Sequence, residues 1–425
     1  MKVFRQLITA SLLFPTSMIV AACAPDAGTS EPSAGEPEVG VVTSAEGSDV
    51  HLAAVTEAPT GFDALTNGFV DQTAFDAARV TFAGVEEIAD GLGPVFNAQS
   101  CRECHQNPTV GAGSQITELR AGHFTGTTFV DAPGGSLIAS RAIDPTIQER
   151  VPAGNEVRTF RLSISLFGDG FVEAIDSNTL LAISNNQPAA QRGTLIQVPV
   201  LESPGNVRAG RFGWKNQQAS LESFAADAYV NEMGITSPLQ PTDNTSNGRS
   251  VAAFDTVADP EDDGEDIELF ADFMRSLKAP PVDAAIAGTA SAQRGSNLFT
   301  SIGCATCHVR TITTAPAGTV INGGALTVPA ALGDKNIHPF GDFLLHDIGT
   351  GDGIVQEGGQ GTRNQVRTSA LWGLRARDRL MHDGLTVTFS DAIARHRNQA
   401  QTAQNNFNNL STSQQNDLLT FLSSL

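Results

Sequence analysis

Apolar residues recur at helical spacing in three segments of the second half of the chain. In residues 266–277 they stand three or four positions apart, and Pro280-Pro281 ends the pattern. Residues 290–299 form a second, shorter segment of this kind. The third begins with a Ser-x-x-Gln capping box at residues 411–414 and continues with leucines on one face. The pattern therefore predicts two internal helices and a helical C-terminal tail.

Apolar and polar residues alternate instead in two segments of the first half, residues 160–166 and 194–200. Alternation with a period of two is typical of half-buried strands. We therefore expect a mainly α fold with a few short β-strands, mostly in the N-terminal half.

The first residues have the features of an export signal. Lys2 and Arg5 precede a mostly apolar stretch, residues 7–20, and two alanines and Cys23 follow. The apolar stretch is short for a membrane span. An ordinary signal peptide and a transmembrane anchor are the alternatives, but the cysteine favours a lipoprotein signal peptide over residues 1–22 with lipidation at Cys23. We expect an exported lipoprotein on the periplasmic side of a bacterial membrane, the outer membrane being favoured over the inner.

Residues 23–50 are rich in Pro, Gly, Ser, Ala and Glu and contain no aromatic side chain. They cannot bury enough apolar surface to offset the entropy of ordering, so we expect a flexible acidic tether.

The whole chain has 46 acidic and 26 basic side chains, a formal net charge of −20. This acidity argues against nucleic acid as a partner and is compatible with a basic electron-donor protein.

Four of the five cysteines fall in two Cys-x-x-Cys-His motifs, the sequence that carries covalently attached c-type haem. Each motif supplies two thiols for one haem and a histidine that becomes the proximal iron ligand. The residues are Cys101, Cys104 and His105 in the first motif and Cys304, Cys307 and His308 in the second. Zinc ligands or redox dithiols are the alternative, but zinc ribbons place their cysteine pairs roughly 15–20 residues apart. We therefore expect two covalently bound haem c groups.

The two motifs indicate how the chain is divided. We expect an N-terminal haem domain over residues 51–247, a linker and helix over residues 248–283, and a C-terminal cytochrome c-like haem domain over residues 284–425. The boundary follows a polar stretch that ends in an acidic run at residues 261–266.

Several further segments resemble those of a known family. They are residues 93–97, 167–175, 211–215, 231–236, 367–373 and 380–384. Together they are similar to the di-haem oxidoreductase family of peroxidases, also labelled thiol oxidoreductases, which is distantly similar to bacterial di-haem cytochrome c peroxidases and MauG-type enzymes. The resemblance covers nearly all of residues 63–425. A thiol substrate rests on that label alone, and the cysteines are already assigned.

The relatives divide the work between their two haems, and the resemblance implies the same division here. Peroxide would bind at the first haem, held by His105, and the second haem, held by His308, would relay electrons. The iron of a relay haem needs a sixth ligand. In the peroxidases a His-Asp-Gly is followed fourteen positions after its histidine by a distal Met, and in this chain His396 stands at that position. A bis-His haem lacks the thioether that raises the reduction potential, so we expect a low potential.

Other assignments stay open at the second haem. His396, flanked by two arginines, could be a solvated helix residue, and Met381 and His346 are then the fallback ligands. A MauG-like His/Tyr haem is disfavoured because the single tyrosine, Tyr229, lies far along the chain from this motif.

Three residues are implied near the first haem. His123 matches a releasable distal ligand, Glu232 matches the acid–base glutamate that moves the peroxide proton, and Trp214 matches a tryptophan between the haems. An ordinary loop histidine, an exposed helix-end carboxylate and a buried structural tryptophan are the respective alternatives. Relatives usually carry a glutamine upstream of the glutamate, but here Ser220-Leu-Glu is followed by Ser and then Phe224, which departs from the peroxidase pattern.

Two functions follow from these residues. The first is an enzyme that reduces hydrogen peroxide with electrons from a periplasmic donor protein, and the second is a non-catalytic, membrane-tethered electron-transfer cytochrome. The enzyme is favoured by the family resemblance. Relatives also hold a calcium ion between their domains, but residues 375–379 depart from the usual Thr-x-Pro, so calcium stays an open alternative.

Overall fold

The computed structural model describes residues 54–425, and the expected signal peptide, Cys23 and nearly all of the expected tether lie outside this range. Its helices are α1 (Gln72–Ala83), α2 (Cys101–Cys104), α3 (Asp169–Glu173), α4 (Ser177–Asn186), α5 (Leu221–Ala228), α6 (Glu265–Ser276), α7 (Ala284–Ala287), α8 (Ala290–Ser301), α9 (Phe389–Ala394), α10 (Gln401–Asn408) and α11 (Thr412–Leu422). A π-helix, η4 (Tyr229–Met233), continues α5, and short 3-10 turns connect other elements.

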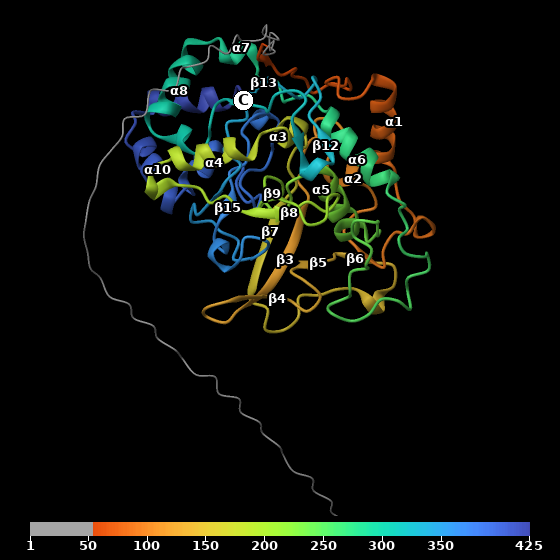
Figure 1. The fold of residues 1–425 in the computed structure, drawn as a ribbon. Helices are drawn as coiled ribbons and strands as arrows, with labels where there is room; N and C mark the ends of the chain where they lie inside the picture. Colours follow the sequence, from red (N-terminus) through yellow and green to blue (C-terminus); the bar gives the residue numbers. More distant parts are fainter. Residues whose placement is uncertain (1–53) are drawn as a thin grey trace, which may run out of the picture. The chain divides into compact units, whose positions relative to one another are not determined.

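The strands are short apart from two. They are β1 (Thr56–Glu57), β2 (Val95–Phe96), β3 (Thr117–Phe124), β4 (Phe129–Asp131), β5 (Leu137–Ile138), β6 (Arg141–Ala142), β7 (Val157–Leu162), β8 (Gln197–Pro199), β9 (Val207–Ala209), β10 (Ile312–Thr313), β11 (Val320–Ile321), β12 (Leu326–Thr327), β13 (Lys335–Ile337), β14 (Leu345–His346) and β15 (Val366–Arg367). The long strands β3 and β7 pair antiparallel, and β4 and β5 add to the other edge of β3. Figure 1 shows β3 and β7 extending side by side away from the main group of helices.

Helix α6 is the centre of the helical group near the first motif. It packs against α1, α3 and α5, and aromatic rings fill the contact with α1: the centroids of Phe82 and Phe273 lie 4.6 Å apart. Glu173 on α3 is fully buried and accepts from the guanidinium of Arg275 on α6 at 2.8 and 3.2 Å. The motif of α2 thus lies against an aromatic helical core, with the rings of Phe82 and His105 6.4 Å apart between centroids.

Helices α8 and α11 pack directly against each other in the part of the fold that carries the second motif. Gly295 lets their backbones approach, since a Cβ there would overlap the backbone carbonyl of Asp417. Arg294 pairs with the carboxylate of Asp417 at 2.7 Å. A separate apolar cluster, which includes Phe299 and Phe421, fills the contact between these two helices.

Segments of the two expected halves pair and pack against each other. Thr56–Glu57 of β1 pairs in parallel with β13, which lies far along the chain, and the largest apolar cluster draws Phe75 and Phe273 together with Ile337 and Trp372. Residues 53–425 cluster into one unit.

The expectation of a mainly α fold is wrong. The structure is about 33% helical and 15% strand, with many small sheets. Most strands have only two or three residues, which is too short to leave an alternating pattern. In the long strand β3 the charged residues Glu118 and Arg120 lie on an inward-facing side. The strand therefore lacks the usual alternation of buried apolar and exposed polar residues.

The three predicted helices are confirmed. They correspond to α6, α8 and α11, and α11 begins with the expected capping box between Ser411 and Gln414. The two predicted strand segments overlap β7 and β8.

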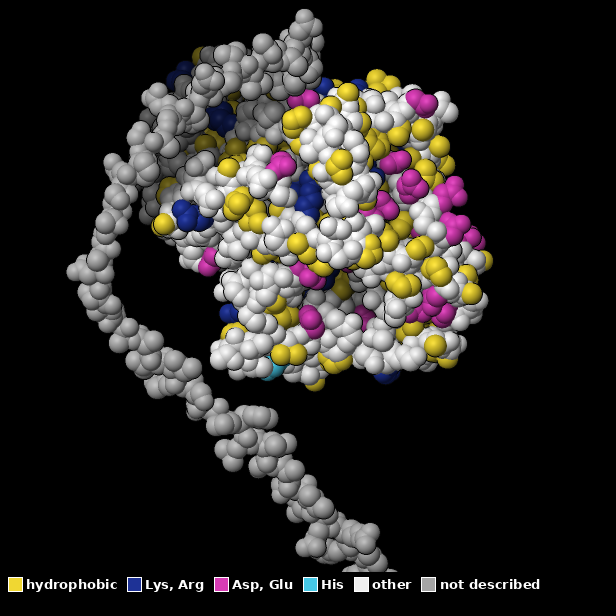
Figure 2. All heavy atoms as spheres, in the orientation of Figure 1, with side chains coloured by type: hydrophobic (Ala, Val, Ile, Leu, Met, Phe, Trp, Pro, Cys, Tyr) yellow, Lys and Arg dark blue, Asp and Glu magenta, His cyan; other side chains and the backbone are white. Residues whose placement is uncertain are grey.

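The surface and hydropathy of the described residues add two observations. On the face shown in Figure 2, Asp and Glu side chains gather along the edge where Figure 1 places α1 and α6, whereas Lys and Arg are scattered. Among residues 54–425, every helix is too short or too polar to cross a membrane.

Candidate haem sites

At the second motif, His308 faces His396. The centroids of the two imidazole rings lie 6.5 Å apart. A metal–imidazole nitrogen bond is roughly 2 Å long, and two such bonds added to the dimensions of the two rings span about this separation. His308 follows the turn after α8, and His396 follows α9, so both rings are positioned by helix ends.

The other nitrogen of each of these rings is hydrogen-bonded to the backbone. Nδ1 of His308 lies 2.9 Å from the carbonyl oxygen of Phe340, and Nδ1 of His396 lies 2.8 Å from that of Ala392. A carbonyl accepts only, so Nδ1 donates and the Nε2 lone pair is available for a metal. Burial lowers the pKa of His308 to about 4 and also lowers that of His396. Both rings are therefore neutral, as iron ligands must be.

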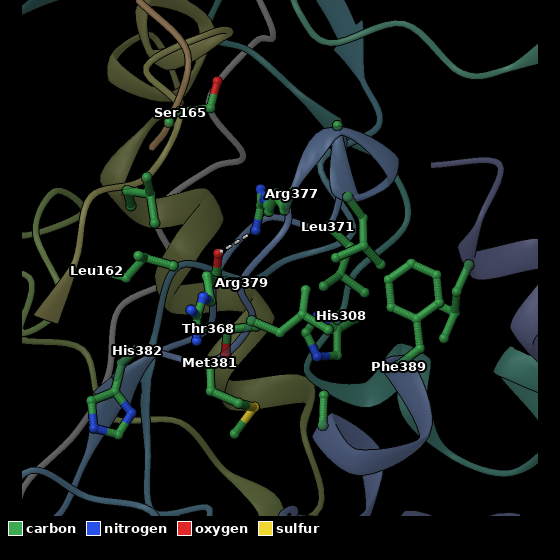
Figure 3. A pocket seen from close by; sticks show the side chains of 18 of the residues that line it. Leu162, Ser165, His308, Thr368, Leu371, Arg377, Arg379, Met381, His382 and Phe389 are labelled. Atoms are coloured by element: carbon green, nitrogen blue, oxygen red, sulfur yellow. Dashed lines mark hydrogen bonds between the residues drawn. The ribbon is translucent and has the colours of Figure 1, made fainter. Parts of the chain in front are cut away.

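A cavity of about 220 Å³ surrounds these rings. Its lining includes Cys304, Cys307, His308 and His396, and most of the rest is apolar. Figure 3 shows His308, Met381 and Phe389 arranged around this cavity. The four motif cysteines are free thiols, so the thiols, both imidazoles and the apolar walls of this site fit a covalently held haem.

The two fallback ligands have different surroundings. His346 is buried, its Nε2 lies 2.8 Å from Asp342, and its Nδ1 lies 3.8 Å from the sulfur of Cys307. Burial alone lowers the pKa of His346, but the bonds with Asp342 and Cys307 outweigh it and raise that pKa to about 10. Both ring nitrogens of His346 are thus engaged. Met381 lines the cavity.

At the first motif, α2 carries Cys101 and Cys104 and ends at His105. Nδ1 of His105 is buried without a hydrogen-bond partner, and the imidazole ring lies close to the backbone of Ala112 and Ile164. Burial lowers the pKa of His105 to about 4. A neutral, half-buried imidazole beside two free thiols fits the first haem, which this motif implies.

Glu232 lies close to this first motif. It belongs to the π-helix η4, and such wide turns recur at functional sites. The backbone carbonyl of Glu232 accepts from Asn97 and Ala98, and its carboxylate accepts from Nδ2 of Asn97 at 2.9 Å. Burial, and next the charge of Glu232, raise the pKa of the Cys104 thiol to about 12. Glu232 is therefore a half-buried carboxyl group near the end of η4, close to Cys104, and not an exposed one.

The sequence interpretation missed two residues here, Glu118 and Arg120. Both lie on the same face of β3, and Nε of Arg120 donates to Glu118 at 2.6 Å. The carboxyl groups of Glu118 and Glu232 are within hydrogen-bonding distance of each other. Burial, and then the charge of Glu118, raise the pKa of Glu232 to about 8. The only local signal of Glu118 and Arg120, two charged residues at alternate positions, is equally typical of a solvated strand face.

His123 lies elsewhere on the same strand. It stands five residues beyond Glu118, about 17 Å along a strand, and on the opposite face because side chains alternate. Its side chain is 49% exposed, and Nδ1 lies 2.7 Å from Glu156. The structure thus gives His123 a surface partner and does not bring it to Glu232.

Trp214 is buried and lines the cavity of the second motif. Its indole N–H donates to the backbone carbonyl of Leu162 at 2.8 Å, and its ring meets that of His382 edge to face, with centroids 6.1 Å apart. The tryptophan therefore stands where β7, which pairs with β3, reaches the cavity of the second motif.

Two motifs, each with free thiols and a half-buried neutral histidine, define a di-haem redox protein. The chain belongs to the di-haem oxidoreductase family: the family model described as "Di-haem oxidoreductase, putative peroxidase" matches residues 112–425. It is thus an oxidoreductase with haem cofactors, as the sequence resemblance implied. None of the curated proteins matches the chain.

Three solved structures are similar to this chain at low identity. Hydrazine synthase of Kuenenia stuttgartiensis is 14% identical with a TM-score of 0.41, covering 92% of this chain and 100% of its own. A MauG-like protein associated with microbial copper homeostasis is 15% identical with a TM-score of 0.40, covering 90% and 95%. A variant of the diheme peroxidase BthA from Burkholderia thailandensis is 15% identical with a TM-score of 0.34, covering 87% and 91%. The family match, and not these likenesses, identifies the chain.

Proposed function

We propose that this oxidoreductase reduces hydrogen peroxide at the haem site of His105, with electrons that enter at the site of His308 and His396. In this proposal both haems are c-type, attached through Cys101 and Cys104 and through Cys304 and Cys307. When bound, the haem irons supply the redox equivalents and an open coordination position for peroxide. The protein's own side chains position the two sites and handle the proton.

The observation that carries the proposal is the contrast between the two sixth positions. His396 stands across from His308 with its Nε2 available, which supports a closed, six-coordinate site suited to electron transfer. Near the first motif, His123 is the histidine that follows His105 in the N-terminal half, and it is engaged with Glu156 at the surface. Carboxyl groups occupy the interior beside Cys104 instead, which supports an open site with acid–base groups.

Glu232 is the group that would handle the peroxide proton. It can give a proton to the peroxide oxygen that leaves as water and take one up from the other oxygen. Nδ2 of Asn97 orients its carboxylate. Trp214, at the junction between β7 and the cavity of the second motif, supports electron passage between the sites.

The test is stopped-flow absorbance with electron paramagnetic resonance on the half-reduced protein mixed with hydrogen peroxide. We expect a high-spin haem that is oxidised rapidly and turns over with an added electron donor. Two low-spin haems that are indifferent to peroxide would overturn the proposal and favour a tethered electron carrier.

We extend the proposal to the cell from the sequence alone. A lipid on Cys23 would hold the protein on the periplasmic side of a bacterial membrane, the outer membrane by preference, where a periplasmic donor protein supplies electrons. A Cys23→Ala variant is then expected in the soluble periplasmic fraction.

Calcium at residues 375–379 forms no part of the proposal. In the described part of the chain, carboxylates gather instead at Asp243, Asp255 and Asp259.

A further inference from the structure

Glu118 has a role that neither the family resemblance nor the sequence motifs assign. We propose that Glu118 and Glu232 share one proton, and that Arg120 keeps the charge on Glu118 so that Glu232 is the carboxylic acid of the pair. Glu118 is then a positioning residue that acts through Glu232. The inference rests on the proposed peroxide reduction and deepens it.

The geometry of the pair supports this assignment. The carboxyl groups of Glu118 and Glu232 lie within hydrogen-bonding distance of each other, and two carboxylates at that distance cannot both be ionised at low cost. Arg120 holds Glu118 from one side through Nε at 2.6 Å and Nη2 at 3.2 Å. Arg161 stands 3.8 Å from the same carboxylate. Glu232 instead has the neutral amide of Asn97 at 2.9 Å.

This asymmetry decides which carboxyl group holds the proton. Burial by itself raises the pKa of Glu118, but Arg120 and Arg161 outweigh it and hold that pKa below its usual range. Burial and the charge of Glu118 raise the pKa of Glu232 to about 8. Pairs of titratable groups whose surroundings push their pKa values apart are characteristic of acid–base sites.

The pair fits the proton balance of the reaction. Hydrogen peroxide, two electrons from the donor protein and two protons give two water molecules, and the O–O bond breaks. As the O–O bond breaks, Glu232 gives its proton to the oxygen that departs as water and takes up the proton that the other peroxide oxygen releases, while Glu118 stays charged. The pair therefore ends each cycle with the single proton with which it began.

The test compares the pH dependence of peroxide reduction by the holoenzyme in three variants. In the wild type, kcat/KM for peroxide should fall above about pH 8, as Glu232 ionises. Glu118→Gln removes the neighbouring negative charge, so the falling limb should move to lower pH. Arg120→Gln removes the cation, so the limb should move to higher pH. Glu156→Gln, at an exposed carboxylate paired with His123, is the matched control and should leave the limb in place.

Infrared spectroscopy of the holoenzyme gives a readout that does not depend on activity. Glutamate labelled with carbon-13 at its carboxyl group separates the protein band from the haem propionates. The wild type should show a protonated glutamate band at pH 7, which both Glu232→Gln and Glu118→Gln should abolish. If Glu118→Gln leaves both this band and the pH limb unchanged while the wild type reduces peroxide, the pair is overturned and the proposed function stands. If the band responds as expected in a protein that does not reduce peroxide, the pair stands and the proposed function fails.

Discussion

The hydroxyl of Ser163 donates to the backbone carbonyl of Cys104 at 2.7 Å. The preceding residue, Leu162, accepts the indole N–H of Trp214 at 2.8 Å. Two hydrogen bonds and one peptide unit therefore connect the first motif with a tryptophan that lines the cavity of the second.

Breaking this connection should slow electron transfer between the haems. We expect Ser163→Ala and Trp214→Phe to slow the equilibration of one electron between the two sites, because each removes one hydrogen bond of the path. Ser163→Ala also removes the hydrogen bonds of the Ser163 hydroxyl with the backbone N–H and the hydroxyl of Ser114, so it should lower the free energy of unfolding by about 0.5–1.5 kcal/mol for each hydrogen bond lost. Stopped-flow reduction with one electron equivalent measures the rate. Ser165→Ala, at another serine that lines the same cavity, is the control, and equal slowing in all three variants would argue against the path.

Replacing His396 should change the second haem alone. His396→Met introduces a thioether, which raises the reduction potential relative to a second imidazole, and it should alter the low-spin paramagnetic resonance signal. Redox titration followed by spectroscopy measures both quantities. His338→Ala, at a histidine that is 48% exposed and pairs with Glu57, should change neither. An unchanged potential and signal in the His396 variant would remove it as a ligand.

Glu232→Gln should affect both rate and stability. Loss of a general acid–base group typically costs 10²–10⁴-fold in rate, as approximate bounds. In the unfolded chain Glu232 ionises near pH 4.5, whereas the folded protein keeps its proton up to about pH 8. The unfolded state therefore binds fewer protons in this window, and the contribution of Glu232 to stability declines as pH rises from 4.5 to 8.

Denaturant unfolding at pH 5 and pH 8 tests this linkage. Glu118 titrates in the opposite sense because its pKa is lowered in the folded protein. Its contribution to stability is complete above its ordinary pKa and is lost only as the pH falls below that value, outside the interval tested. The stability of Glu232→Gln relative to the wild type should therefore increase from pH 5 to pH 8. A difference that stays constant across that interval would contradict a raised pKa at Glu232.

The buried pair of Glu173 and Arg275 should be a large contributor to stability. Glu173→Ala leaves the guanidinium of Arg275, which is only 5% exposed, with the longer contact to Asp272 at 3.5 Å and without its closest charge partner. Breaking such a pair typically costs about 3–5 kcal/mol. Asp76→Ala removes the partner of Arg79 in an exposed pair on α1 and should cost less than about 1 kcal/mol. Similar losses in the two variants, measured by thermal or denaturant unfolding, would contradict this account.

The contact between α8 and α11 should tolerate no added methyl group at Gly295. Gly295→Ala places a Cβ against the backbone carbonyl of Asp417, and overpacking of this kind typically costs about 1–3 kcal/mol. At Gly361 an added Cβ would point into open space, and the backbone there has no positive φ, so Gly361→Ala is the control and should be near neutral. A stable Gly295→Ala variant with an unchanged second-haem spectrum would show that the helices can separate without loss.

Local sequence signals predicted the elements whose pattern is complete within a few turns. The helix α6 has its apolar stripe and its stop signal in one segment, and the capping box of α11 is made by Ser411 and Gln414 of the same turn. The facing of His308 and His396 follows from tertiary packing, and their spacing to known motifs suggested it only through the family resemblance.

The rest depended on partners that are distant in sequence. Glu118 and Arg120 acquire their meaning from Glu232, more than a hundred residues away, and nothing local separates them from a solvated strand face. His123 lies on the same strand and could not be placed on either face without knowing which side of β3 turns inward. The many two-residue strands were missed because their hydrogen-bond partners, and not their own residues, define them.

The pairing of β1 with β13 constrains the order in which the chain can fold. Thr56 and Lys335, which meet in this ladder, are separated by 279 residues. At roughly 5–20 residues per second, the ribosome delivers the second strand tens of seconds after the first. During that interval the chain already carries Cys101 and Cys104 but lacks β13, so the apolar core shared by the two halves, which includes Ile337 of β13, can close only after the second strand has been made.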